Sequence, residues 1–208
     1  MHHLDELITT QWPTVIAPKY GSLAPMTSAG DRFLVTSHGL RMQIKRSWIE
    51  AVIPMQTGRL IRPIPYGPGP DAGVTLLCGK APTMLLERFT HEARACLPNE
   101  HAAWFVWNEQ KRTWRYQPVK VLEHSPSRIT YERPTLAPEE HLVVDVHSHG
   151  LSEAFLSSVD EADDRGTLQV SLVVGSLGDS EPTYKAVVRC LGFTQPMGID
   201  QFVGGPHA

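Results

Sequence analysis

A stretch rich in proline and glycine, residues 62–73, constrains the fold of this chain more than any other feature. Its twelve residues include four prolines and three glycines. Proline lacks a backbone N–H donor and glycine favours turns, so the stretch is expected to form neither a helix nor a central strand. The sequence therefore predicts a linker or an extended loop here, with a small module in residues 1–72 and a larger domain in residues 73–208.

The segment before this stretch has the pattern of a β-strand. From Leu40 to Lys45, apolar and polar residues alternate. A period of two indicates a strand with one buried face. Residues 37–39 have the sequence Ser-His-Gly, which is typical of a hairpin turn. We expect the first module to be small and rich in β-structure.

The segment after the stretch mixes helical and strand-like patterns. Between Pro82 and Leu97 the apolar residues fall on one helical face, and Pro98 is expected to end the helix. Strand-like segments follow at residues 102–107, 114–122, 128–131, 142–147, 168–174 and 184–191, and a second short helix is expected over residues 157–164. This order predicts an α+β domain with a mixed sheet rather than a βαβ repeat.

Composition narrows the classes of function. The chain has 41% hydrophobic and 20% charged residues, as a globular protein does, and its net charge of −3 comes without a run of Lys or Arg. We therefore expect no nucleic acid and no membrane as the main partner. The N-terminal sequence lacks the pattern of a secretory signal, and the three cysteines are widely spaced without a Cys-x-x-Cys pair. These features favour a reduced, cytoplasmic protein.

A hydrophobic segment leads into the sequence His147-Ser148-His149. If the strand continues through these residues, both imidazoles project to the same face of the sheet. Two neighbouring imidazoles form half of a zinc site. Two surface histidines at a polar strand end explain the pattern equally well when it is taken alone.

Asp160 follows His149 by eleven residues, in the first turn of the expected second helix. Its carboxylate can fold back beside the two imidazoles. Two histidines and one carboxylate leave a fourth tetrahedral position open, as in catalytic zinc sites. Ser157 and Asp160 also fit the capping pattern of a helix start. The alternative ligands are Asp145, Glu153, Asp163 and Asp164, of which Asp145 shares the strand face of the histidines.

Hydrolysis at such a site needs a general base. Glu100 lies between Pro98, which ends the predicted helix, and the strand that begins at Ala102. A junction of this kind can face the metal. By spacing alone, an exposed glutamate in a loop is the commoner interpretation.

Together these residues resemble the motif of the JAMM (MPN+, JAB1/MPN/Mov34) zinc metallopeptidases. In that family a His-x-His pair is followed after ten residues by an Asp, with a Ser three positions before it. The same spacing relates His147, His149, Ser157 and Asp160. The step Pro98-Asn99-Glu100 before a hydrophobic strand resembles bacterial and archaeal members. The resemblance covers about residues 80–195, and it departs from the family at residue 150, where a glycine stands in place of the usual proline.

The resemblance implies a JAMM-like (cytidine-deaminase-like) fold, in which helices flank a mixed β-sheet. It implies Zn²⁺ bound by His147, His149 and Asp160, with Glu100 as the base and Ser157 as a donor to the developing oxyanion. The implied activity is hydrolysis of a peptide or isopeptide bond at the C-terminal tail of a ubiquitin-like protein, as in a deubiquitinase. A catalytically silent scaffold that acts as a protein-interaction module is the alternative.

A narrower resemblance, in residues 98–107, 145–150 and 160–166, is to the plasmid-associated PRTRC members of the family. It implies a ubiquitin-like protein or its conjugate, and a ThiF-like activating enzyme of the same cassette, as partners. Two other enzyme classes fit less well. Amidohydrolase and PHP barrels need roughly 200 residues after their His-x-His, and too few follow His149. A cysteine protease is disfavoured because none of the cysteines stands in a nucleophile motif.

Overall fold

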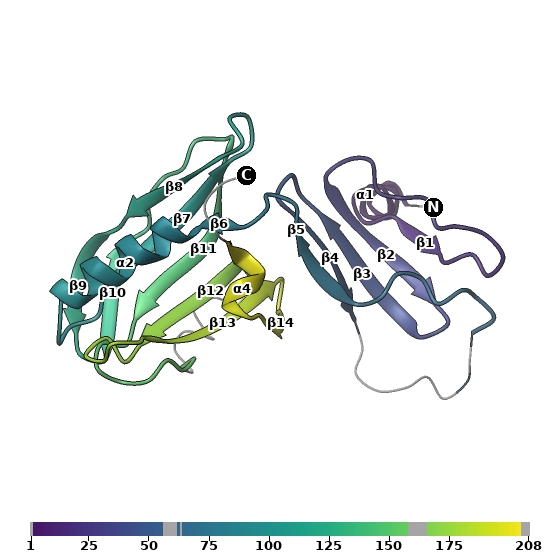
Figure 1. The fold of residues 1–208 in the computed structure, drawn as a ribbon. Helices are drawn as coiled ribbons and strands as arrows, with labels where there is room; N and C mark the ends of the chain where they lie inside the picture. Colours follow the sequence, from purple (N-terminus) through teal and green to yellow (C-terminus); the bar gives the residue numbers. More distant parts are fainter. Residues whose placement is uncertain (1, 56–61, 63, 158–165, 205–208) are drawn as a thin grey trace. The chain divides into compact units, whose positions relative to one another are not determined.

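The computed structural model describes residues 2–55, 62, 64–157 and 166–204. The chain divides into two compact units, Met1–Leu77 and Cys78–Ala208 (Figure 1). The mixed α+β architecture that the sequence predicts is confirmed, because the described residues contain mixed sheets and few helices.

The first unit is built on one five-stranded sheet in the order β1-β2-β3-β4-β5. Its strands are β1 (Thr14–Ile16), β2 (Gly30–Thr36), β3 (Gly39–Lys45), β4 (Ile49–Pro54) and β5 (Gly73–Leu76). β1 pairs with β2 in parallel, and the other neighbours are antiparallel. The β2–β3 hairpin turns at Ser37 and His38, within the turn that the sequence predicts.

The proline- and glycine-rich stretch lies inside the first unit. Its described residues from 64 to 72 form neither a helix nor a strand. Gly73–Leu76 then pairs with β4 as the last strand of the sheet. The first unit therefore extends to Leu77, a few residues beyond the boundary expected from composition.

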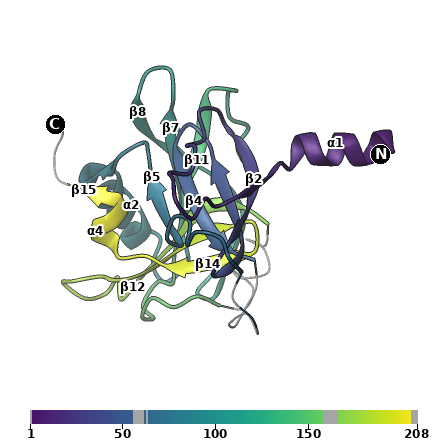
Figure 2. The ribbon, with the colours of Figure 1, turned by 90° about the vertical axis from the view of Figure 1, so that its right-hand side faces the viewer.

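A short helix, α1 (His3–Gln11), precedes the sheet and was not expected from the sequence. The His2 side chain caps it by accepting a hydrogen bond of 3.2 Å from the Leu4 N–H. Figure 2 shows α1 projecting away from the sheet, and none of its residues is buried. No helix in the described part of the chain is long and apolar enough to cross a membrane.

The second unit contains a six-stranded sheet in the order β14-β13-β12-β11-β7-β8. Its strands are β7 (Ala102–Asn108), β8 (Thr113–Pro118), β11 (Glu140–Ser148), β12 (Leu168–Gly175), β13 (Thr183–Cys190) and β14 (Phe193–Pro196). β11 and β12 are parallel, and the other neighbours are antiparallel. The smaller elements are β6 (Ala81–Pro82), α4 (Ile199–Phe202) and β15 (Val203–Gly204), with β6 paired to β15.

The helix α2 (Thr83–Ala95) lies across one face of this sheet (Figure 1). Its buried residues are Leu85, Phe89 and Ala93, which follow the helical period expected from the sequence. Phe89 is fully buried. Burial of an aromatic side chain of this size stabilises the fold by about 1.5–3 kcal/mol. α2 therefore anchors the apolar face of the sheet and leaves the opposite face for other elements.

A separate hairpin, β9 (Lys120–Ser125) with β10 (Arg128–Glu132), follows β8. The sequence pattern suggested one strand over residues 114–122. The structure ends β8 at Pro118 and begins β9 at Lys120. Proline has no N–H to continue a strand ladder, which accounts for the break. The second predicted helix, residues 157–164, lies outside the described residues except for Ser157.

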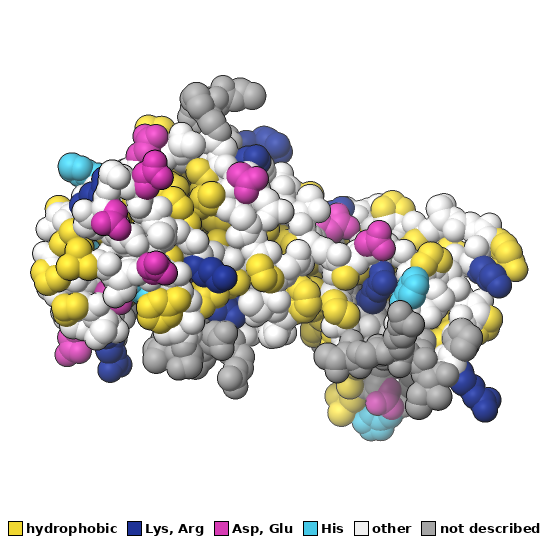
Figure 3. Space-filling model, turned by 60° about the horizontal axis from the view of Figure 1, so that its bottom comes forward, with side chains coloured by type: hydrophobic (Ala, Val, Ile, Leu, Met, Phe, Trp, Pro, Cys, Tyr) yellow, Lys and Arg dark blue, Asp and Glu magenta, His cyan; other side chains and the backbone are white. Residues whose placement is uncertain are grey.

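Acidic and basic side chains are interspersed on the surface. On the face drawn in Figure 3, neither sign gathers into a continuous patch among the residues shown in colour. The three cysteines are free thiols, and Cys190 is buried. Burial raises the pKa of the Cys78 thiol to about 12, although a backbone hydrogen bond acts in the opposite direction. Cys78 is therefore a poor nucleophile at neutral pH.

Candidate metal centre

The central strand β11 carries the first candidate ligand. His147 lies opposite Ala102 of β7 and Val173 of β12, and Asp145 lies opposite Trp104 and Ser171. Residues two apart on a strand project to the same face. Asp145 and His147 therefore share one face of the sheet.

This face points away from α2. Phe105, which pairs with Val144, makes a tilted ring contact with Tyr116, and the Tyr116 hydroxyl donates to Glu92 of α2 at 2.6 Å. The face that contains Val144 and Phe105 is thus the one covered by α2. Because Asp145 and His147 alternate with Val144, they lie on the opposite face of the sheet.

His149 follows the end of β11 and turns its ring toward His147. Its backbone N–H donates to the Val174 carbonyl at 2.9 Å, which continues the pairing with β12 beyond the assigned strand. His149 is 7% exposed, and the edge-to-face contact of its ring with Phe155 has a centroid distance of 4.3 Å. The Nε2 atoms of His147 and His149 lie 3.2 Å apart.

That separation is compatible with two ligands of one tetrahedral zinc ion. Zinc–nitrogen bonds of roughly 2.0–2.1 Å at a tetrahedral angle place the two nitrogens about 3.3 Å apart. The imidazole pair therefore fits the metal that the motif implies. The third expected ligand, Asp160, lies outside the described residues. Within the described ranges, no set of three His, Cys, Asp or Glu side chains is grouped closely enough to hold a metal.

Gly150 accounts for the path of the chain after the two histidines. Its φ is +56°, a left-handed conformation that favours glycine. A Cβ at this position would lie 2.8 Å from the Pro98 carbonyl oxygen, so a side chain would clash with the backbone before Glu100. Proline, with φ near −65°, cannot adopt this conformation. The glycine is therefore a requirement of close packing here.

A pocket of about 700 Å³ opens beside the two histidines. Three groups of residues line it: the acids and histidines Glu100, Asp145, His147 and His149; the hairpin residues Pro126, Ser127, Arg128, Ile129, Thr130, Tyr131 and Arg133; and Ser152, Phe155, Ser157 and Ser171. The structure thus brings five residues singled out from the sequence, Glu100, Asp145, His147, His149 and Ser157, to one pocket. Its volume lies within the range of small-ligand sites.

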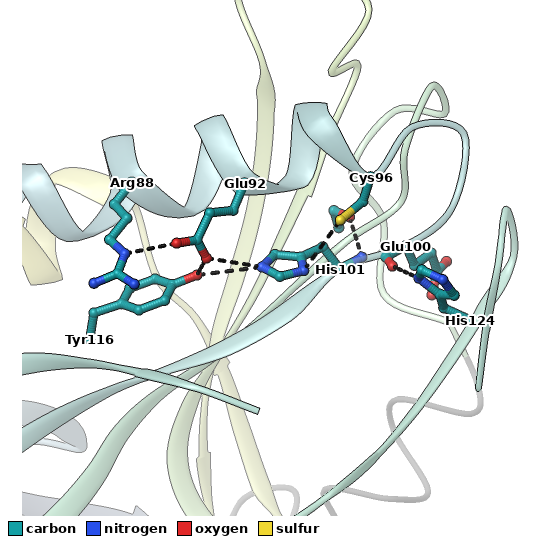
Figure 4. A network of polar contacts seen from close by, with 8 residues as sticks. Arg88, Glu92, Cys96, Glu100, His101, Tyr116 and His124 are labelled. Carbon is teal, nitrogen blue, oxygen red and sulfur yellow. Dashed lines mark hydrogen bonds and ion pairs between the residues drawn. The ribbon is translucent and has the colours of Figure 1, made fainter. Parts of the chain in front are cut away.

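Glu100 is buried, with 5% of its surface exposed, so it is not the exposed loop residue that spacing alone favours. Its backbone N–H donates to the Ser125 carbonyl at 2.9 Å. Its own carbonyl lies 3.1 Å from Nδ1 of His124 (Figure 4). These contacts with β9 fix the backbone of Glu100 at the wall of the pocket.

The next residue, His101, ties this segment to β11. The His101 N–H donates to Oγ of Ser148 at 2.9 Å, and the Ser148 N–H donates to the His101 carbonyl at 2.8 Å. Ser148 is fully buried between the two candidate ligands. The predicted base and the predicted ligands are therefore joined by reciprocal hydrogen bonds through their direct neighbours in sequence.

The ring of His101 is held by a polar network under α2 (Figure 4). Its Nε2 lies 3.3 Å from Oε2 of Glu92, and its Nδ1 lies 3.7 Å from Sγ of Cys96. Burial lowers the pKa of His101, while the Glu92 carboxylate opposes that shift. Arg88 completes the network through a 2.8 Å ion pair with Glu92. The network holds the residue after Glu100 in place from the other side of the sheet.

Asp145, an alternative ligand, is engaged by the hairpin. The Tyr131 hydroxyl lies 2.9 Å from each of its carboxylate oxygens, and the Trp104 indole N–H lies 3.4 Å from that hydroxyl. Burial and the charge of Asp145 raise the pKa of Tyr131, so the phenol is protonated at neutral pH and donates to Asp145. Asp145 therefore joins the sheet to the hairpin wall of the pocket.

The remaining candidates are Ser157 and Glu153, which the structure describes, and Asp163 and Asp164, which it does not. Ser157 lines the pocket and lies outside regular structure. Glu153 is exposed and is not among the lining residues. Asp163 and Asp164 lie, like Asp160, outside the described residues.

Sequence reasoning missed three residues that shape the site: His101, Ser148 and Tyr131. Tyr131 and Ser148 act through contacts between segments far apart in sequence, and no local pattern reports such contacts. His101 stands next to Glu100, but a single histidine in a junction carries no signal of the network under α2. The sequence contains one indication of these roles, which is that Ser148 lies between the two candidate ligands His147 and His149.

Comparisons with known proteins divide the chain in the same two parts. Residues 82–190 match a family model described as prokaryotic homologs of the JAB domain, and residues 2–77 match one described as a domain of unknown function (DUF2016). The solution structure of protein DSY2949 from Desulfitobacterium hafniense is similar to the chain at 17% identity and a TM-score of 0.44, covering 60% of this chain and 90% of that one. No curated protein matches the chain significantly.

Proposed function

The chain belongs to the prokaryotic homologs of the JAB domain, and from this premise we propose that it is a zinc-dependent hydrolase of peptide or isopeptide bonds. The observation that carries the proposal is the convergence of His147 and His149, with Nε2 atoms 3.2 Å apart, in the pocket that the buried Glu100 also lines. Burial of a carboxylate is costly, so the presence of Glu100 at the wall of this pocket favours a role in catalysis.

In the proposed site, His147, His149 and Asp160 hold the zinc ion. Zinc bound there would act as a Lewis acid that polarises a carbonyl oxygen and acidifies water. Glu100 takes the proton of the attacking water and delivers it to the leaving amine, so that one carboxylate serves as base and then as acid. Ser157 donates a hydrogen bond to the oxygen on which negative charge develops. Water is the nucleophile, and no acyl group is attached to the protein.

The proposed substrate is the C-terminal tail of a ubiquitin-like protein, free or conjugated. This part of the proposal rests on the resemblance to JAMM enzymes and on the pocket, which is lined by residues of the hairpin, the sheet and the loop after β11. The resemblance to PRTRC members extends the proposal to a ThiF-like activating enzyme as a partner.

The alternative is a catalytically silent scaffold of the same fold. The two proposals differ in what a chelator does to hydrolysis of a model peptide that ends in Gly-Gly. The enzyme should lose activity with a strong chelator, regain it with added zinc, and tolerate iodoacetamide. Its cysteines lie outside the pocket, and Cys78 has a raised pKa. Absence of hydrolysis by the zinc-loaded protein supports the scaffold, and inhibition by iodoacetamide with indifference to the chelator contradicts both.

A further inference from the structure

The first unit contains a pocket of its own, with a volume of about 380 Å³. Its floor is the sheet, through side chains of β2, β3 and β4. Its walls are two segments from opposite ends of the unit, residues 17–25 and 68–70, which consist mainly of proline, alanine and glycine. All lining residues belong to the first unit, so the pocket is distinct from the candidate metal centre.

The two walls are fixed against each other by their backbones. The Gly67 N–H donates to the Ala17 carbonyl at 2.9 Å, and the Gly67 carbonyl accepts from the Ser37 N–H at 2.8 Å. A Cβ at Gly67 would lie 2.1 Å from the Pro18 carbonyl oxygen, so glycine alone permits this approach. The pocket is therefore preformed and does not depend on a ligand to assemble its walls.

The floor carries three polar side chains in a row across neighbouring strands. Arg32 of β2 donates through Nε to Oε1 of Gln43 on β3 at 2.9 Å. Gln43 donates through Nε2 to Oε1 of Glu50 on β4, also at 2.9 Å. The glutamine thus orients a cation on one side and a carboxylate on the other, with both lining the pocket.

The arginine is buried without a direct ion pair. Arg32 is 8% exposed, and Nη2 donates to the Ala24 carbonyl at 2.7 Å, while the described residues offer Nη1 no acceptor. None of the described carboxylates lies within ion-pair distance of it, whereas Arg46 of the same unit pairs with Asp31 at 2.8 Å. Burial lowers the pKa of Arg32, and the charge of Glu50, which forms no ion pair with it, offsets this only in part, so the buried cation remains costly. An anionic ligand that contacts Nη1 would remove that cost.

The neighbouring Glu50 restricts which anion the pocket accepts. A phosphate or another polyanion beside Arg32 would also meet the carboxylate of Glu50 and be repelled. A ligand that carries a carboxylate together with an N–H donor satisfies both residues. The last residue of a peptide has this combination, since its terminal carboxylate and its own amide N–H lie only a few bonds apart.

We propose that the pocket of the first unit binds the carboxy-terminal residue of a peptide, with its carboxylate on Arg32 and its amide N–H on Glu50. Capture of a terminal carboxylate is a recurring mode of peptide recognition. The pocket volume lies near the lower end of the range for small-ligand sites, which suits the last one or two residues of a chain. This inference concerns a site in the other unit and stands whether or not the metal centre is catalytic.

The test uses the full chain, labelled with ¹⁵N, and the pentapeptide Ala-Ala-Ala-Gly-Gly with either a free carboxylate or a terminal amide. The free acid should shift the backbone amides of Gly21, Ala24 and Gly69 and the side-chain amide of Gln43. The amidated peptide should bind roughly tenfold more weakly or worse, because it lacks the charge that meets Arg32. This comparison needs no variant and cannot be confused with misfolding.

Two variants then locate the binding. Arg32→Gln should weaken binding of the free acid roughly tenfold or more, while Arg46→Gln, a change of an arginine that already has a carboxylate partner, should leave it unaltered. Equal affinity for the acid and the amide overturns the proposal. Chemical-shift changes confined to residues around His147 would also overturn it. So would tighter binding of inorganic phosphate than of the peptide in this pocket.

Discussion

The Tyr131 hydroxyl lies 2.9 Å from both carboxylate oxygens of Asp145, and this contact joins the hairpin wall of the pocket to the strand that carries His147. The hairpin has no strand pairing with the six-stranded sheet among the described residues. The tyrosine is therefore one of a few polar links between them, together with the contacts that Glu100 makes to Ser125 and His124.

Tyr131→Phe should lower the free energy of unfolding by about 1–3 kcal/mol, because a buried carboxylate loses a hydrogen-bond donor. Zinc content should be retained, since Asp145 is assigned a positioning role and not a ligand role. Urea denaturation and metal analysis check the two statements. Tyr20→Phe, at a tyrosine that is 92% exposed, is the matched control and should change neither. Loss of zinc from Tyr131→Phe with the fold intact would indicate that Asp145 is a zinc ligand.

Glu100→Gln should reduce hydrolysis roughly 100- to 10,000-fold, because glutamine cannot accept the proton of the attacking water. The amide is nearly the same size as the acid, so zinc content and melting temperature should remain close to wild type. Glu153→Gln, at an exposed acid near the histidines, is the control and should keep full activity. Activity that survives Glu100→Gln would assign the base to another residue.

Ser157→Ala separates two roles for one hydroxyl. As a donor to the oxyanion, Ser157 should contribute about 100- to 1,000-fold to kcat. As a helix cap alone, it should contribute about 1 kcal/mol to stability and leave turnover nearly unchanged. We expect the first outcome, because Ser157 lines the pocket. Steady-state kinetics and thermal unfolding distinguish the two, with the exposed Ser180→Ala as the control.

His101 should make the stability of the chain depend on pH. Burial lowers its pKa from the usual 6.5, so the folded state favours the neutral ring while the unfolded state takes up a proton below about pH 6.5. Its contribution is therefore present above that pH and is lost as the pH falls. His101→Gln should show a smaller loss of stability between about pH 7.5 and about pH 5.5 than the wild type. His91→Gln, at an exposed histidine of α2, is the control and should lose as much stability as the wild type. Equal losses of stability in all three proteins would contradict the lowered pKa of His101.

Local patterns were sufficient to predict the elements that carry the site. The apolar face of α2 and the continuous hydrophobic run of β7 are properties of short segments, and both form near the expected residues. That the side chains of His147 and His149 lie close together could also be predicted, because residues i and i+2 of a strand share a face. These predictions needed no knowledge of which strands are neighbours.

The parts that could not be predicted depend on contacts distant in sequence. The burial of Glu100 results from hydrogen bonds to β9, which starts some twenty residues later. The role of Gly150 follows from the approach of Pro98, which lies on a different segment. α1 escaped prediction for a different reason, since it buries no residue. Pattern reasoning detects a helix by the face it buries.

Metal analysis of purified variants tests the central claim most directly. The wild-type protein should contain one zinc ion per chain, because the proposed ligands His147, His149 and Asp160 would leave one tetrahedral position open. His147→Ala and Asp160→Ala should each lose the zinc while circular dichroism shows an intact fold. The control is His91→Ala, at an exposed position of α2, which should keep its zinc. Undiminished zinc in both His147→Ala and Asp160→Ala would contradict the assignment of this pocket as a metal centre.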